Sequence, residues 1–300
     1  MYLSIIAPFH NEEKNITLFT EEVIDSLKNF SKPYEIILVN NATTDGSAKE
    51  AEVLAKKHPQ VKLVVLRVKG KGVGLAEGYR QAKGELVVFM DTDLQDDPRH
   101  IPEFVEKIES GYDLVNGIRS VRKDNAVIKI YSRFANIFLK SFMNSPFTDI
   151  NCGFKIMRRE VLEEFPLYAN NFRFLPVASY YKGFRVGEMP VNNRERMHGS
   201  SKYGMRKLFY GLIDTITAYF IYQFSEKPLH FFGLIGVMLF MFGGIVTAIL
   251  LFERIFYGVL LYRRPGLQFA FFFMTAGIQV IMTGFIGELI VYLHKRLQQK

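Results

Sequence analysis

The sequence predicts a mixed α/β domain with a mostly parallel sheet, followed by a surface helix and a pair of membrane-spanning helices. Over roughly the first 205 residues, apolar β-rich runs alternate with amphipathic helical segments, which is typical of right-handed βαβ units. Beyond about residue 228, two long stretches are nearly free of charge. Each of these stretches is long enough to cross a hydrocarbon core of about 30 Å as a helix.

The soluble part divides into strands and helices in a regular order. Strands are expected at residues 3–7, 35–39, 61–68, 86–90, 114–118 and 185–191. Helices are expected at residues 11–30, 47–58, 101–108 and within 119–143, with further helices ending at 82 and beginning at 159 and 172. This alternation is what a sheet with crossover helices requires.

The fourth strand leads into an acidic motif, Asp91-Thr92-Asp93-Leu94-Gln95. Ligands of open α/β sheets bind at the carboxyl ends of the strands. Two carboxylates placed there repel each other unless a cation neutralises them. Carboxylate and amide oxygens are ligands that suit Mg²⁺ or Mn²⁺ holding a diphosphate. Taken alone, the motif fits an acidic turn equally well.

The glycines of Gly70-x-Gly72-x-Gly74 superficially match a dinucleotide-binding loop. We reject that interpretation because the run follows the third strand rather than the first. In addition, no single acidic residue ends a strand at the required distance, since Asp91 belongs to a doublet. Residues 69–74 are instead expected to lead into the helix that ends at 82, and their glycines to let the chain turn close to a ligand or a neighbouring strand.

Two basic segments are candidates for binding phosphate. Arg119, Arg122 and Lys123 follow a strand end and precede a helix with interleaved lysines and arginines, which fits a core helix and a lipid-facing helix equally well. The second segment, residues 192–203, combines arginines, a lysine, hydroxyls and glycine, and reads either as a solvated loop or as a phosphate clamp.

The C-terminal part predicts a membrane region. Residues 228–252 contain only His230 as a titratable group, and residues 265–287 contain no charged residue. We therefore divide the chain into a soluble domain at 1–205, an interfacial amphipathic helix at 206–227 and a transmembrane region at 228–300. The spans are expected at about 229–252 and 266–293.

Composition narrows the surroundings of the soluble domain. The N-terminus lacks the basic and apolar regions of a signal peptide, so this domain is expected in the cytoplasm of a two-span membrane protein. The net charge of +8 favours anionic lipid and phosphate-bearing partners, and we expect no nucleic acid because no nucleic-acid motif is present. The single cysteine, Cys152, rules out an internal disulfide and a cysteine-cluster metal site.

Several motifs occur in a fixed order along the chain. They are Pro8-x-x-Asn11-Glu12, Asp91-Thr92-Asp93-Leu94-Gln95 followed by Pro98, Asp149-x-x-Cys152-Gly153-Phe154-Lys155, and Arg196-x-x-Gly199-x-Ser201-Lys202. In this order they resemble the motifs of the family 2 inverting glycosyltransferases, in the branch that glycosylates polyprenyl phosphates. The resemblance covers residues 1 to about 220, and two C-terminal spans fit one subgroup of that branch.

This resemblance implies a GT-A fold, which is Rossmann-like with a mostly parallel sheet. It also implies inverting sugar transfer from a UDP-, GDP- or CDP-linked donor to dolichyl or undecaprenyl phosphate, with Mg²⁺ or Mn²⁺ as cofactor. The product would be a lipid-linked monosaccharide for glycan assembly or modification. The assembly state, monomer or homo-oligomer, is left open.

The resemblance also implies roles for individual residues. The catalytic residues would be Asp91, Asp93 and Asp149, and the metal ligands Asp91, Asp93 and Gln95. The nucleotide-binding residues would be Pro8, Asn11, Glu12, Asn40, Asn41, Asp45, Lys71, Gly72, Asp91 and Thr92. The residues that bind the acceptor phosphate and the leaving diphosphate would be Arg119, Arg122, Arg196, Ser201 and Lys202.

The chain departs from the family pattern at the end of the second strand. The family usually carries Asp-Asp-x-Ser-x-Asp-Gly there, whereas this chain has Asn40-Asn41-Ala42-Thr43-Thr44-Asp45-Gly46. A family aspartate at this place accepts a hydrogen bond from the nucleotide base. An asparagine can accept or donate but carries no charge, so uracil, guanine and cytosine all remain open.

The proposed acceptor explains why the sequence shows no obvious catalytic histidine. A phosphate monoester has a second pKa near 6, so a polyprenyl phosphate needs no strong general base to attack the sugar.

A processive polysaccharide synthase is disfavoured because the chain has no tryptophan for the Gln-x-x-Arg-Trp motif of those enzymes. Transfer to another lipid or to a soluble sugar remains an alternative. A non-catalytic membrane adaptor is the third, favoured only by the asparagine pair.

Overall fold

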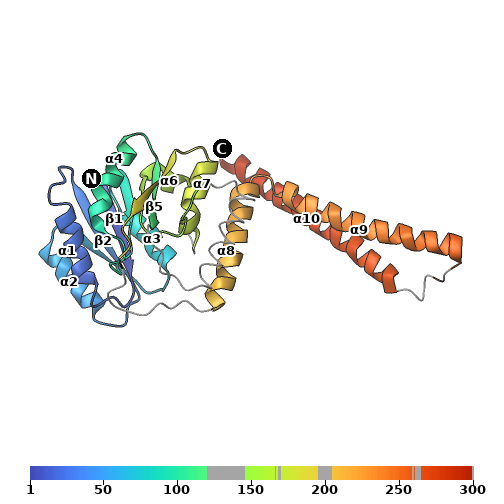
Figure 1. Cartoon of the computed structure of the whole chain (residues 1–300), viewed down its shortest axis with the longest axis horizontal. Helices are drawn as coiled ribbons and strands as arrows, with labels where there is room; N and C mark the ends of the chain where they lie inside the picture. Colours follow the sequence, from blue (N-terminus) through green and yellow to red (C-terminus); the bar gives the residue numbers. More distant parts are fainter. Residues whose placement is uncertain are drawn as a thin grey trace. The chain divides into compact units, whose positions relative to one another are not determined.

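The structure is a computed structural model that describes residues 1–119, 146–165, 167, 170–194, 205–258, 260 and 265–298, with the backbone alone at 205–212 and 298. The chain forms two compact units, Met1–Thr215 and Ile216–Lys300. Figure 1 shows the first unit as a sheet with helices around it and the second as a pair of long helices.

A seven-stranded sheet, in the order β3-β2-β1-β4-β6-β5-β7, is the framework of the first unit. The strands are β1 (Leu3–Phe9), β2 (Tyr34–Asn41), β3 (Val61–Leu66), β4 (Leu86–Phe89), β5 (Leu114–Arg119), β6 (Lys155–Arg158) and β7 (Val186–Val191). All neighbouring pairs are parallel except those made by β6, which is antiparallel to both β4 and β5. The predicted α/β fold with a mostly parallel sheet is confirmed.

Helices and turns connect these strands. They are α1 (Ile16–Ser26), α2 (Ser47–Lys57), α3 (Lys71–Gln81), the 3₁₀ turn η1 (Pro98–His100), α4 (Ile101–Glu109), α6 (Arg159–Glu164), the 3₁₀ turn η2 (Asn171–Phe174) and α7 (Leu175–Tyr181). The first two crossovers therefore follow the alternation that the apolar periodicity predicts.

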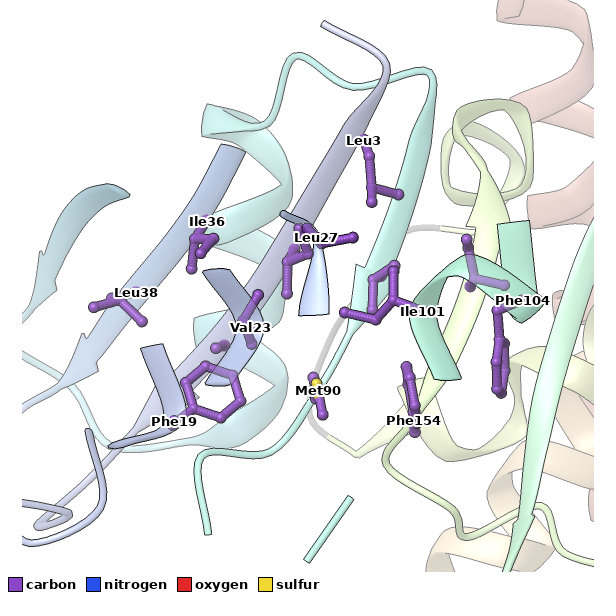
Figure 2. Close-up of a cluster of buried hydrophobic side chains, with 14 of the residues drawn as sticks. Leu3, Phe19, Val23, Leu27, Ile36, Leu38, Met90, Ile101, Phe104 and Phe154 are labelled. Carbon is purple, nitrogen blue, oxygen red and sulfur yellow. The ribbon is translucent and has the colours of Figure 1, made fainter. Parts of the chain in front are cut away.

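One face of the sheet packs against α1, α2 and α4. Leu3 on β1 and Ile36 and Leu38 on β2 belong to the same buried cluster as Phe19 of α1 and Phe104 of α4. Figure 2 shows these side chains converging between strands and helices. The central strands read as continuous apolar runs because both of their faces are buried.

Helix α3 covers the opposite face of the sheet. A Cβ added to Gly78 would stand 3.1 Å from Val39 on β2 and would also collide with Ile6 on β1. Glycine therefore lets α3 lie directly on the strands. This close packing carries the first residue of α3, Lys71, to the carboxyl ends of β1 and β2.

The structure corrects three expectations. Helix α1 begins at Ile16 rather than Asn11, because Asn11 has a left-handed backbone (φ 59°) that no helix continues. Helix α3 begins at Lys71, so Gly72 and Gly74 lie within its first turns rather than before it. Strand β6 was not expected, because Lys155 interrupts its apolar pattern; nevertheless that residue is only 1% exposed.

The second unit consists mainly of α9 (Pro228–Tyr257) and α10 (Pro265–Gln298). Both are long and apolar enough to cross a membrane by length and composition, with mean hydropathies of 2.6 and 1.9 over an 18-residue stretch of each. The helices pack antiparallel through small residues: a Cβ on Gly236 would lie 2.6 Å from the carbonyl oxygen of Gly277. At one end, Glu288 Oε2 accepts a hydrogen bond from the amide of Leu229 (3.3 Å), which caps the start of α9.

Helix α8 (Met205–Phe224) occupies most of the segment predicted to lie along the membrane surface. Its position at an interface and the three-part division at 205 and 227 stay predictions. The helix expected within 119–143 lies outside the described residues.

Candidate active site

Three loops meet at one edge of the sheet because β1, β2 and β4 are parallel neighbours. Phe9, the last residue of β1, pairs with Asn40 of β2, whereas Phe89, the last residue of β4, pairs with Ile6, so β4 ends three positions before the end of β1. The last residues of these strands and the loops that follow them carry Pro8–Glu12, Asn40–Asp45 and Asp91–Gln95. The structure thus brings together most of the residues predicted to bind nucleotide and metal.

Asp91, the first residue of the acidic motif, is held between two elements. Its Oδ1 lies 2.5 Å from Lys71 Nζ, at the start of α3. A Cβ added to Gly153 would lie 2.5 Å from its Oδ2, so the loop 149–153 closes over the carboxylate. Burial alone would raise the pKa of Asp91, but Lys71, and then Lys155 and Arg119, lower it overall.

The rest of the motif forms a tight turn. Leu94 has a left-handed backbone (φ 62°), and its side chain is buried. The Gln95 amide donates to Asp93 Oδ1 at 3.2 Å, which draws the turn back on itself. Asp93 and Gln95 therefore follow Asp91 within one short turn at the end of β4.

This turn has the electrostatics of a cation site. Burial, followed by the charges of Asp91 and Asp93, raises the pKa of Asp96 to about 7. Among the described residues no cluster of three or more His, Cys, Asp or Glu forms a complete metal cage. The protein instead offers two carboxylates and an amide oxygen, a donor set that fits Mg²⁺ or Mn²⁺ sharing its remaining positions with water and diphosphate.

The two asparagines at the end of β2 have different environments. Asn40 Oδ1 accepts a hydrogen bond from the Thr43 amide at 2.9 Å, which shapes the loop. Asn41 Oδ1 is buried and has no hydrogen-bond partner within the described residues. A Cβ on Gly74 would lie 2.5 Å from this oxygen, so the first turns of α3 border it. Asn41 is therefore the asparagine with an acceptor available for a ligand.

Residues at the end of β1 mainly organise the neighbouring loop. The Asn11 amide donates to Thr43 Oγ1 (2.8 Å), and Asn11 Oδ1 accepts from the Thr44 amide (2.8 Å). The Glu12 amide donates to Ser47 Oγ at 2.8 Å. These contacts lock the two loops together, and direct roles of Asn11 and Glu12 in binding nucleotide stay predictions.

Asp45 also acts within this loop. Its carboxylate accepts hydrogen bonds from the Ser47 amide (3.0 Å) and the Thr43 hydroxyl (2.8 Å), next to the start of α2. Burial alone would raise the pKa of Asp45, but hydrogen bonds from the Ser47 hydroxyl, the Thr43 hydroxyl and the Ser47 amide lower it overall. Its predicted contact with the nucleotide stays a prediction, as do those of Pro8, Gly72 and Thr92.

A predicted phosphate ligand and a predicted catalytic residue turn out to be partners. Arg119 Nε and Nη2 contact the two Asp149 carboxylate oxygens at 2.8 and 3.0 Å, a bidentate pair. Burial alone would lower the pKa of Arg119, but Asp149 raises it overall. Asn116 Nδ2 also donates to the Asp149 carbonyl oxygen at 2.8 Å. Arg122, Arg196, Ser201 and Lys202 lie outside the described residues.

Sequence reasoning missed the role of Lys155. This buried lysine of β6 donates to the carbonyl oxygens of Ile150 (3.2 Å) and Cys152, and so holds the loop that closes over Asp91. Burial lowers its pKa to about 8. Burial likewise raises the pKa of the Cys152 thiol to about 12, which leaves it unreactive as a nucleophile. The position of Lys155 inside an apolar run was the sequence feature that could have indicated a buried lysine with a structural role.

Comparison with known proteins places these features in a family. The model for glycosyl transferase family 2 matches residues 4–165. A dodecaprenyl-phosphate galacturonate synthase of Rhizobium johnstonii is 31% identical over 300 residues, covering 98% of this chain and 89% of the relative. An undecaprenyl-phosphate 4-deoxy-4-formamido-L-arabinose transferase of Yersinia enterocolitica is 29% identical over 293 residues, covering 96% and 88%.

Solved structures support the fold. Glucosyl-3-phosphoglycerate synthase of Mycobacterium tuberculosis, crystallised with Mn²⁺, UDP-glucose and phosphoglyceric acid, matches with a TM-score of 0.55. The match covers 74% of this chain and 79% of that one, at 18% identity. The structural match establishes a shared fold. Because the sequence identity is low, it does not establish the substrates.

Proposed function

Because the chain belongs to glycosyl transferase family 2, we propose that it transfers a sugar from a nucleotide-sugar donor to a polyprenyl phosphate, with inversion at the anomeric carbon. The observation that carries this proposal is the extent of the relatives' similarity. The two polyprenyl-phosphate transferases align with 98% and 96% of the chain, a range that takes in the apolar helices as well as the soluble unit.

The carboxyl edge of the sheet supports the donor side of this reaction. Asp91, Asp93 and Gln95 would hold a divalent cation, Mg²⁺ or Mn²⁺, against the donor diphosphate. When bound, the cation supplies charge neutralisation for the departing diphosphate. Asn41 offers the nucleotide base a carboxamide, which leaves UDP-, GDP- and CDP-linked donors as candidates.

Lys71 acts as a second cation on the donor side. Its ammonium contacts Asp91 and lies 5.0 Å from the centre of the Phe172 ring. An ammonium is a point charge on a flexible stem, so it can turn from the carboxylate to a phosphate oxygen when the diphosphate binds. Lys71 would thereby offset the charge of the leaving group.

The protein has to orient the acceptor phosphate rather than remove a proton from it. A phosphate monoester is largely dianionic at neutral pH and attacks the anomeric carbon directly, opposite the leaving diphosphate. Arg119 would bind the acceptor phosphate, with Arg122, Arg196, Ser201 and Lys202 as further candidates. The bidentate contact of Asp149 with Arg119 supports a role for this aspartate in fixing the guanidinium rather than in accepting a proton.

The apolar helices account for access to a lipid acceptor. We propose that α9 and α10 span the membrane, that α8 lies along its surface, and that the soluble unit faces the cytoplasm. Basic residues near both ends of the membrane region, including Lys227 and Lys295, agree with this orientation, whereas three arginines between the spans, Arg254, Arg263 and Arg264, weaken the charge bias. The lipid head would then reach the site from the membrane surface.

A panel of donors tests this function. Membranes containing the chain are incubated with UDP-, GDP- and CDP-linked sugars and short-chain polyprenyl phosphate, with and without EDTA. We expect one donor class to yield an organic-soluble glycolipid, and EDTA to prevent its formation. The Asp93→Ala variant should form no product, whereas Asp25→Asn, at an exposed carboxylate on α1, should match the wild type. EDTA-resistant activity, or an active Asp93→Ala variant, would contradict the metal assignment.

A further inference from the structure

The turn that follows the acidic motif is fastened to the segment that follows β7. The Arg194 amide donates to the Gln95 carbonyl oxygen at 2.8 Å, and an antiparallel β-bridge pairs Asp96 with Asn193. The Asn192 amide donates to His100 Nε2 at 3.2 Å. We call this set of contacts the turn clip.

The Arg194 side chain extends the turn clip to a third element. Its Nη2 lies 3.0 Å from Asp97 Oδ1, and its Nη1 donates to both Glu22 oxygens on α1, at 3.0 and 2.8 Å. The Asp97 side chain is only 2% exposed. One guanidinium thus joins the acidic turn, the segment after β7 and the first helix, which suits its rigid fork of donors.

The turn needs external support for two reasons. Asp91, Asp93, Asp96 and Asp97 crowd four carboxylates into seven positions, which repel each other. In addition, Leu94 adopts the left-handed conformation that disfavours side chains with a Cβ. A strained backbone of this kind persists only where surrounding contacts over-determine it.

Arg99 provides an internal comparison, because it binds the same carboxylate without linking elements. Its Nη2 lies 2.5 Å from Asp97 Oδ2, yet the arginine is only two positions further along the same turn. The Arg99 side chain is 74% exposed, against 30% for Arg194. Arg99 therefore shares the charge of Asp97, but within the part of the chain that the structure describes its side-chain hydrogen bonds go to Asp97 and none reaches β7 or α1.

We propose that Arg194 is a positioning residue that holds the turn from Gln95 to Asp97 so that Asp93 and Gln95 present their oxygens to the donor's metal ion. This role rests on the proposed function, since it presupposes a metal-diphosphate site at the end of β4. Partners behind metal ligands commonly change metal affinity or activity by about 10- to 100-fold when removed. Arg194 touches neither reacting group and acts through the turn clip.

The test measures Mn²⁺ binding to the full chain in detergent by electron paramagnetic resonance, with UDP, GDP or CDP present. We expect Arg194→Ala to weaken nucleotide-dependent Mn²⁺ binding by about 10- to 100-fold and to raise the donor KM by a similar factor. Arg194→Lys should recover part of the loss, because one ammonium can still contact Asp97. Arg99→Ala should stay within about twofold of the wild type.

Glu22→Gln keeps the test decisive if Arg194→Ala fails to fold, since it weakens only the contact with α1 and should give an intermediate loss. Unchanged Mn²⁺ binding in Arg194→Ala or Glu22→Gln, or a loss confined to the acceptor KM, would overturn the positioning role while leaving the proposed function intact. A wild-type chain that binds no Mn²⁺ with any of the three diphosphates would overturn the metal site itself and this role with it.

Discussion

The two edges of the sheet in the first unit are built differently. At the carboxyl edge, the described non-glycine residues with positive φ, Asn11, Ala42 and Leu94, each follow the end of a parallel strand. The same edge holds Asn41 Oδ1, which has no hydrogen-bond partner among the described residues, and the Asp96 carboxyl, whose pKa is raised to about 7 by burial and by neighbouring carboxylates. Strain and unbalanced charge are concentrated there.

At the amino edge, by contrast, the buried charge is matched. Glu35, at the start of β2, is 1% exposed and accepts hydrogen bonds from Ser4 Oγ (2.7 Å), Lys62 Nζ (2.5 Å) and the Lys83 amide (2.7 Å). Features that lower stability are typical of functional sites, whereas satisfied networks stabilise a fold. Substitutions at the two edges should therefore affect different measurements.

The largest expected effect is at the carboxyl edge. Asp93→Asn should lower the transfer rate by about a thousandfold or more, because the turn loses a charge that the metal-diphosphate complex requires. The thermal midpoint should not fall, since the substitution relieves repulsion between carboxylates. Initial rates and thermal unfolding of the purified variant check both statements. A large drop in the midpoint with little loss of rate would break the comparison.

Glu35→Gln should have the opposite profile. Its carboxylate binds two side chains and one amide, so removing the charge should cost about 2 kcal/mol of unfolding free energy. The donor KM and kcat should stay within about twofold of the wild type, because the residue lies at the far edge. Denaturant unfolding monitored by circular dichroism, beside steady-state kinetics, measures the two quantities. A strong kinetic defect would show that the edges are coupled.

Asn41→Asp sharpens the comparison at the end of β2. A carboxylate can only accept hydrogen bonds, which suits the N3–H of uracil or the N1–H of guanine and disfavours the bare N3 of cytosine. We expect binding of CDP to weaken by about tenfold relative to UDP, equivalent to about 1.4 kcal/mol. Competition between the diphosphates in the transfer assay measures this ratio, and an unchanged ratio would remove Asn41 from the base site.

The smallest expected effect is the change with pH in the stability difference between the wild type and Glu35→Gln. Burial alone would raise the pKa of Glu35, but Lys62, Ser4 and the Lys83 amide lower it below its ordinary value of 4.5. A carboxyl with a lowered folded-state pKa stabilises the fold above its unfolded pKa, and this contribution disappears as the pH falls through the folded value. The stability difference between wild type and Glu35→Gln should therefore be full at pH 7 and shrink below pH 4.5. A difference independent of pH would argue against a charged Glu35.

Much of the fold follows from local patterns in the sequence. The continuous apolar runs 36–39 and 86–89 become strands β2 and β4, as expected for strands buried on both faces. The antiparallel strand β6 could not be predicted in this way, because Lys155 breaks the run and is stabilised by carbonyl oxygens of its own loop. The start of α1 was missed because the left-handed Asn11 is fixed by a loop more than thirty positions away.

The candidate site was predictable in its residue types but less so in its contacts. The acidic motif lies where ligands of α/β sheets bind, at the carboxyl end of a central strand, but only its order with the other motifs favoured a metal site over an acidic turn. The pairing of Arg119 with Asp149 was not accessible, because the two lie on separate elements joined only by the fold. Arg194 had no local signal either, since its partners come from α1 and from the acidic turn.

One measurement tests the central claim, metal-assisted transfer to a lipid phosphate at the carboxyl edge, most directly. The purified protein is incubated with a labelled nucleotide sugar, Mn²⁺, and equal amounts of undecaprenyl phosphate and the soluble acceptor 3-phosphoglycerate, and both products are quantified by mass spectrometry. We predict that label enters the lipid almost exclusively and that Asp93→Asn abolishes its entry. Label in the soluble product alone, or lipid labelling that survives Asp93→Asn, would contradict the account.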